Sequence, residues 1–195
     1  MTKFSLIFCV MFSLCSAASA NQLSPAEQIL AAKQAAPQHI TNEASYMVWI
    51  DGAFKQRIEG SNGFTCLLLT DPQGRYEPSC LNQEAMRSVF PVYAYQTKML
   101  YQGLDYAQIT ANVKQKAILG EFPQAGHGGL VYMMSEENKW HHHGQEKTYK
   151  VPPHLMFYFP AIEPETMGFN KNFGQPSLIR EYAHLSTLMV MMPQK

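Results

Sequence analysis

The chain has little net charge and no long apolar run beyond its N-terminus, and each shortage excludes a class of protein. Basic and acidic side chains number 15 each, so the formal net charge is zero at pH 7. A nucleic-acid-binding protein normally shows a basic excess or patch, and this sequence has neither. No later apolar run approaches the roughly 20 residues that a membrane-spanning helix needs. We therefore expect no nucleic-acid partner and no membrane span.

Common catalytic motifs are also missing. The sequence contains no G-x-S-x-G, C-x-x-C or H-E-x-x-H pattern. These patterns mark nucleophilic serines, dithiol redox pairs and zinc proteases respectively. Their absence leaves nucleophilic and redox catalysis with little support.

The N-terminus has the three parts of a secretory signal peptide. Lys3 supplies the positive charge, residues 4–14 form an apolar or small run, and Ala18-Ser19-Ala20 is an A-x-A cleavage site. Removing the first 20 of the 195 residues leaves 175, a length typical of one domain. The pattern predicts a signal peptide over 1–20 and a single domain over 21–195, periplasmic or secreted.

Cysteine is scarce: two of the four cysteines fall in the predicted signal peptide. Cys66 and Cys80 remain. In an oxidising compartment two cysteines are most simply one disulfide, worth about 3 kcal/mol in the chain-entropy model. The alternative is a reactive thiol or redox pair, which C-x-x-C spacing would favour and this spacing does not.

Turn and capping signals divide the rest of the chain into helices and strands. Asp51-Gly52 and Asn62-Gly63 tolerate positive φ, as type I′ hairpin turns require, so a three-strand meander is expected. Capping residues, helical periodicity and Pro or Gly breaks predict three helices. Apolar runs predict three late strands. The expected helices are 24–36, 82–103 (broken near Pro91) and 105–120, and the expected strands are 45–50, 54–59, 64–70, 130–134, 155–159 and 185–191.

These elements predict an α+β fold. The sheet is expected to be antiparallel or mixed, with about six strands and three helices on one face, as layer rules favour. Phe54, Gln56 and Ile58 would share one face of their strand, with Lys55 and Arg57 on the other. That alternation predicts a sheet with one solvated face.

Three segments carry a resemblance to known proteins. They are G-S-N-G-F-T-C at 60–66, V-Y-M-M-S at 131–135 and P-H-L-M-F-Y at 153–158. Together they resemble a group of uncharacterised secreted bacterial proteins over most of the mature chain. The group has no known activity, ligand or site, so the resemblance implies nothing about function.

Three histidines stand at or just before the starts of the late strands: His127, His154 and His184. Loops at strand ends often carry binding residues on a rigid frame. Parallel strands would bring these imidazoles within reach of one metal ion, whereas antiparallel neighbours would separate them. The ordinary alternative is that each ring bonds a nearby carbonyl.

Two further patterns suggest metals. The run His141–His143 is a less suitable metal site than the three separate histidines, because adjacent residues in a strand point to opposite faces and cannot all reach one ion. Six methionines gather in the late strands, and thioethers with imidazole would suit Cu(I). Methionine is ordinarily a gap-filling core residue, which is the simpler interpretation. The six methionines in the late strands are Met133, Met134, Met156, Met189, Met191 and Met192.

Tyr132 and Tyr158 lie in the late strands near the suspect histidines and are candidates to line an amphipathic pocket. The expected function is an exported, non-enzymatic binding or interaction protein for a small molecule or protein partner. The alternative is a Zn- or Cu-dependent enzyme or metal-binding protein that uses His127, His154 and His184. The two hypotheses differ in whether the histidines converge.

Overall fold

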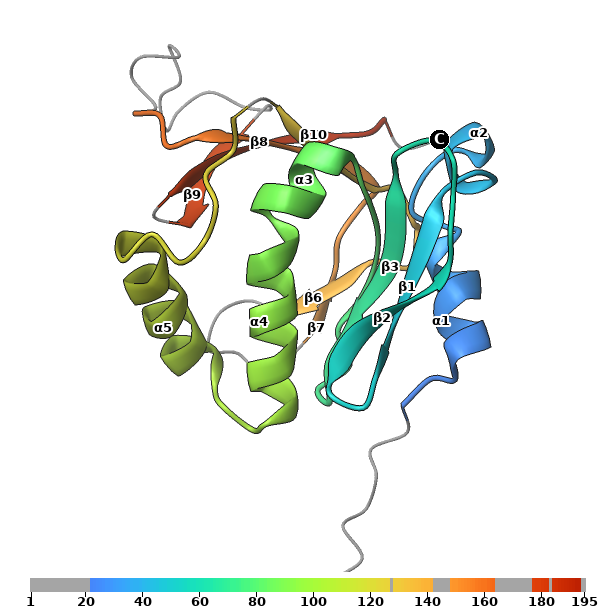
Figure 1. Ribbon diagram of the computed structural model, residues 1–195, viewed down its shortest axis with the longest axis horizontal. Helices are drawn as coiled ribbons and strands as arrows, with labels where there is room; N and C mark the ends of the chain where they lie inside the picture. The colour runs from blue at the N-terminus through green and yellow to red at the C-terminus, as the bar shows by residue number, and fades with distance from the viewer. Residues whose placement is uncertain (1–21, 127, 142–147, 164–176, 183, 194–195) are drawn as a thin grey trace, which may run out of the picture.

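The strands form one mixed sheet with helices on both of its faces (Figure 1). The computed structural model describes residues 22–126, 128–141, 148–163, 177–182 and 184–193. The main strand order is β2-β1-β3-β4-β5-β8-β10-β9, and a β6–β7 ribbon is attached to β4. The strands are β1 (Ser45–Ile50), β2 (Ala53–Ile58), β3 (Thr65–Thr70), β4 (Tyr76–Leu81), β5 (Gly129–Met133), β6 (Lys139–His141), β7 (Thr148–Lys150), β8 (His154–Pro160), β9 (Ser177–Tyr182) and β10 (Leu185–Met191).

The six predicted strands are confirmed within a residue or two, and four more are present. Strand β4 was missed because Glu77, Pro78 and Ser79 interrupt its apolar pattern. It nevertheless pairs along its whole length with β3 in antiparallel register. The α+β class with a mixed sheet is confirmed.

The predicted order of the meander is wrong. Asp51 and Gly52 both have positive φ and form the expected β1–β2 turn. The chain then crosses the start of β1 instead of turning back on β2, so β3 pairs with β1 in parallel. Gly60 lies against the backbone at Ala44 in this crossing. Strand β2 is therefore an edge strand rather than the middle strand.

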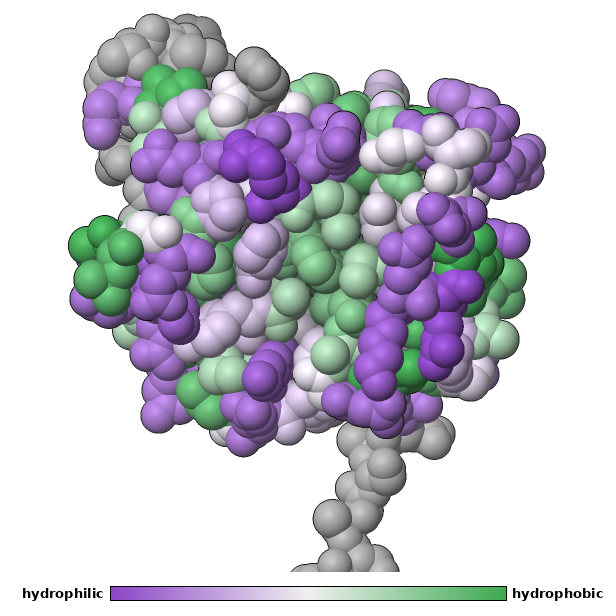
Figure 2. All heavy atoms as spheres, in the orientation of Figure 1, coloured by the Kyte–Doolittle hydropathy of each residue, from purple (hydrophilic) through white to green (hydrophobic). Residues whose placement is uncertain are grey.

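Three consecutive helices cover one face of the sheet: α3 (Gln83–Ser88), α4 (Phe90–Tyr101) and α5 (Tyr106–Ile118). Pro91 lies in the first turn of α4, which explains the predicted break after α3. The largest apolar core lies under these helices and includes Leu67 and Leu81. Figure 2 shows apolar residues between α4 and the sheet, beside the hydrophilic surface of β2.

Helix α1 (Pro25–Ala32) lies on the other face, followed by the short α2 (Gln38–Thr41). Ser24 and Glu27 form the predicted capping box. The side-chain amide of Gln28 is buried. It accepts a hydrogen bond from the backbone N–H of Trp49 and donates one to the backbone C=O of the same residue. It thereby occupies backbone groups of β1 that β3 leaves unpaired. Within the described part of the chain, no helix is long and apolar enough to cross a membrane.

The predicted disulfide is confirmed. Cys66 and Cys80 are directly opposite each other on β3 and β4, with a Cα–Cα distance of 4.0 Å. Both are fully buried in a small core under α1, with Ala32 and Tyr46. The bond is consistent with an oxidising compartment. The predicted signal peptide at 1–20 lies outside the described residues.

Loss of the disulfide should lower stability without changing the fold. We expect Cys66→Ala combined with Cys80→Ala to reduce the free energy of unfolding by about 3 kcal/mol, because the unfolded chain regains loop entropy. Urea denaturation of both proteins, with and without reductant, measures this. Reductant should shift the wild-type midpoint and leave that of the variant unchanged. A wild-type midpoint that does not respond to reductant would contradict the bond's stabilising role.

Candidate functional site

Strand direction separates two of the predicted site histidines. His154 begins β8 and pairs with Met191 at the end of β10, whereas Leu185 at the start of β10 pairs with Pro160. His184 immediately precedes Leu185, so it lies at the opposite end of the pair, about 20 Å away at the rise of an extended strand. One metal ion cannot bind both rings. His127 and the triplet side chains at 141–143 lie outside the described residues.

The described part of the chain offers no alternative cluster of hard or borderline metal ligands. Among the described residues, no group of three or more His, Cys, Asp or Glu side chains is placed to hold a metal ion.

His184 is a buried packing residue. Its ring stacks on Phe122 with centroids 5.8 Å apart, and only 4% of the residue is exposed. Neither ring nitrogen has a hydrogen-bond partner among the residues that the structure describes. Burial lowers the pKa of His184, so the imidazole is neutral near pH 7. Leaving a buried polar group without a hydrogen bond costs about 1–3 kcal/mol of stability. Because so little of the His184 side chain is exposed, it offers almost no surface for binding a ligand.

The two predicted pocket tyrosines face opposite sides of the sheet. Tyr158 is fully buried under α4, with its hydroxyl 2.6 Å from that of Tyr93. Tyr132 packs on Phe64, with ring centroids 5.9 Å apart, in the core under α1. Tyr158 shares its face of β8 with His154, whereas Tyr132 lies on the opposite face, so the structure does not bring Tyr132, Tyr158 and His154 into one binding site.

A buried ion pair that the sequence interpretation missed lies on the helix-covered face. Arg75 Nε donates to a carboxylate oxygen of Glu77, and the two residues are only 7% and 6% exposed. Burial disfavours the charged guanidinium, but the attraction of Glu77 outweighs it, and the pKa of Arg75 is raised overall. Arg75 is therefore a permanent cation beneath the surface.

Asp71 organises the turn that leads into Arg75. One carboxylate oxygen accepts from the backbone N–H groups of Gln73 (2.8 Å) and Arg75 (3.0 Å). The other accepts from the Tyr106 hydroxyl of α5 at 2.9 Å. Burial, together with the negative charge of Asp71, raises the pKa of Tyr106, which stays a neutral donor. The Asp71 carboxylate is thus occupied by donors of the chain itself.

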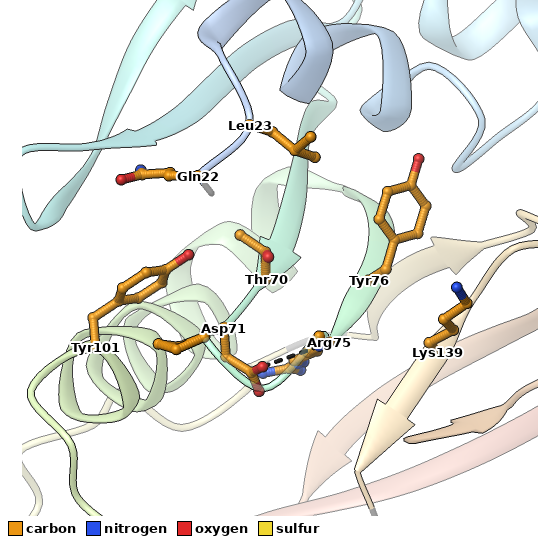
Figure 3. Close-up of a pocket in the computed structure, with 10 residues that line it drawn as sticks. Gln22, Leu23, Thr70, Asp71, Arg75, Tyr76, Tyr101 and Lys139 are labelled. Atoms are coloured by element: carbon orange, nitrogen blue, oxygen red, sulfur yellow. Dashed lines mark hydrogen bonds between the residues drawn. The ribbon is translucent and has the colours of Figure 1, made fainter. Parts of the chain in front are cut away.

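An open pocket of about 280 Å³ adjoins this turn (Figure 3). Its walls come from four separate places in the sequence: Leu23 before α1, the β3–β4 turn, Tyr101 at the end of α4, and Lys139 at the start of β6. Figure 3 shows Thr70 between Tyr101 on one side and Tyr76 with Lys139 on the other. Asp71 and Arg75 also line it.

No family model, curated protein or solved structure matches this chain.

The pocket offers neutral hydroxyls and one uncommitted cation. Burial raises the pKa of both Tyr76 and Tyr101, helped by the negative charge of Glu137 near Tyr76 and of Asp71 near Tyr101, and their phenols stay neutral. The Tyr101 side chain hydrogen-bonds Thr70, and its ring stacks on Trp49 at 5.3 Å. Lys139 is exposed and forms no ion pair with any carboxylate of the described residues. The site thus presents the Lys139 ammonium group beside hydrogen-bonding hydroxyls.

Proposed function

We propose that the protein is an exported, non-enzymatic binding protein whose pocket at the β3–β4 turn takes a small anionic molecule. The observation that carries this proposal is the Lys139 ammonium, which has no ion-pair partner among the described residues and faces a pocket whose one carboxylate, Asp71, is already occupied. An incoming carboxylate or phosphate would supply the missing negative charge. Hydroxyls of Tyr76 and Tyr101 would bond its remaining oxygens.

The size and composition of the pocket favour a small ligand and argue for binding rather than catalysis. At about 280 Å³ it is near the lower end of ligand sites, which are roughly 300–1,000 Å³. A catalytic site needs a nucleophile or base that is free to act. Here the Asp71 carboxylate accepts three hydrogen bonds and the Thr70 side chain is engaged with Tyr101.

Export is part of the same proposal. The N-terminal pattern of Lys3, an apolar run and Ala18-Ser19-Ala20 supports it, as does the Cys66–Cys80 disulfide. N-terminal sequencing of protein recovered from the native host's periplasm or medium tests this part. A mature chain that starts near Asn21 would support it, and a chain that keeps Lys3 in the cytoplasm would contradict it.

Lys139→Gln should weaken binding of small anions. Charge-assisted hydrogen bonds are worth about 1.5–3 kcal/mol, so we expect a loss of about tenfold or more in affinity. Isothermal titration calorimetry with succinate, citrate and inorganic phosphate measures it. Lys114→Gln is the matched control, because it removes the same charge from an exposed position on α5, away from the pocket. Equal affinities of the two variants, or no binding by the wild type to any of the three probes, would contradict the proposal.

A further inference from the structure

A second site is formed by a row of side chains across three neighbouring strands. His154 of β8 pairs directly with Met133 of β5 on one side and with Met191 of β10 on the other. Directly paired residues in antiparallel strands project from the same face, with Cβ atoms about 4.5–5.5 Å apart. The imidazole therefore lies between two thioethers. Antiparallel pairing separates His154 from His184, but it creates this row.

The imidazole is held with one nitrogen available as a ligand. Nδ1 of His154 lies 2.8 Å from the carbonyl oxygen of Pro152, to which it donates as an N–H. That bond fixes the tautomer, so Nε2 carries the lone pair. Histidines that bind metals almost always anchor their other nitrogen in this way. The residue is only 3% exposed, so the ring is held in a fixed position by the side chains packed around it.

The surroundings of the row are soft and apolar. Met133 is buried in the main core, whereas Met191, the last residue of β10, is half-buried and gives access from outside. Met156 and Met189 pair with each other two residues along the same strands, which adds two further thioethers next to the row. The Glu77 carboxylate acts electrostatically on His154, and it is already paired with Arg75.

We propose that Nε2 of His154 and the sulfur atoms of Met133 and Met191 form a binding site for a single Cu(I) ion. Imidazole and thioether ligands select soft monovalent copper over Mg²⁺ or Ca²⁺, which prefer oxygen. The site is separate from the pocket at the β3–β4 turn, and it does not depend on the anion-binding function. The site uses two of the six clustered methionines as copper ligands, and Met134 and Met192 lie outside the row.

The test is a competition titration of the full mature protein with Cu(I) held by bicinchoninate. Ascorbate serves as the reductant, because a thiol reductant would open the Cys66–Cys80 bond and create competing thiolates. We expect the wild type to withdraw one equivalent of copper. Met133→Leu combined with Met191→Leu should bind more than about tenfold more weakly, since even the loss of an outer-shell partner costs a metal site about 10–100-fold.

The matched control is Met134→Leu combined with Met192→Leu, which removes two thioethers next in sequence to the row. It should bind like the wild type. Leucine for methionine conserves volume, so all variants should fold, which circular dichroism checks. Silver(I), a redox-inert substitute, should shift the His154 ring and the Met133 and Met191 methyl resonances in wild-type NMR spectra. A wild type that binds no copper, a control pair that loses as much affinity as the row pair, or silver shifts at Met134 and Met192 but not at Met133 and Met191 would overturn the proposal.

Discussion

Arg75→Met is expected to lower the free energy of unfolding by about 3–5 kcal/mol, the range typical of breaking a buried ion pair from one side. The substitution leaves the Glu77 carboxylate buried without its cation. The substitution also removes the guanidinium group that interacts electrostatically with Tyr106 of α5 and Tyr182 of β9. Urea denaturation at neutral pH measures the loss.

The control is the double variant Arg75→Met with Glu77→Leu. Replacing both members of a buried pair by apolar residues is often neutral, because both desolvation penalties disappear together. The double variant should therefore be more stable than Arg75→Met alone. If it is as unstable as the single variant, the destabilisation comes from lost packing rather than from an uncompensated charge, and the assignment of the pair is contradicted.

Gly60→Ala is the second substitution with a large expected effect, because it blocks the crossing that makes the sheet mixed. A Cβ at this position would lie 2.2 Å from the carbonyl carbon of Ala44 and 2.3 Å from the carbonyl oxygen of Glu43. Both are backbone atoms, so no side chain can rotate away. We expect a loss of more than about 3 kcal/mol, beyond the usual cost of overpacking. Thermal and urea denaturation measure it.

Gly63→Ala separates this clash from the general cost of replacing a turn glycine. Gly63 has φ +76°, and a Cβ added there would meet no atom within 4 Å, so only backbone strain of about 1–2 kcal/mol applies. Gly60→Ala should be clearly the more damaging of the two. Equal losses would show that the close approach at Ala44 does not constrain the fold.

The sequence predicted most elements but not their pairing. Capping residues, glycines and apolar runs are local signals, so the helices and six strands followed from them. Whether β3 turns back on β2 or crosses to β1 depends on contacts between distant backbone segments. The Asn62-Gly63 pair favours a turn in either arrangement. In the structure, the Asn62 side-chain amide donates a hydrogen bond to the carbonyl oxygen of Ile40, and the Asn62 backbone N–H donates one to the carbonyl oxygen of Glu43.

The site was less predictable than the fold, for a related reason. The histidine hypothesis depended on strand direction, which no local pattern fixes. One signal for the buried pair was present: Glu77, Ser79 and Leu81 alternate as one face of β4, and Arg75 immediately precedes the strand in the same alternation. Pro78, between Glu77 and Ser79, argued against a strand at this point, so the alternation was not recognised. The pocket itself joins Leu23, Tyr101 and Lys139 with the β3–β4 turn, segments that only the tertiary structure brings together.

Chemical-shift mapping tests the anion-binding pocket most directly. Amide spectra of isotope-labelled mature protein are recorded during titration with succinate and with inorganic phosphate. The pocket accounts for binding if the saturable shifts gather at Thr70 to Tyr76, Tyr101 and Lys139, and if they are lost in Lys139→Gln but kept in Lys114→Gln. Saturable shifts elsewhere on the sheet, or shifts that Lys139→Gln leaves intact, would contradict it.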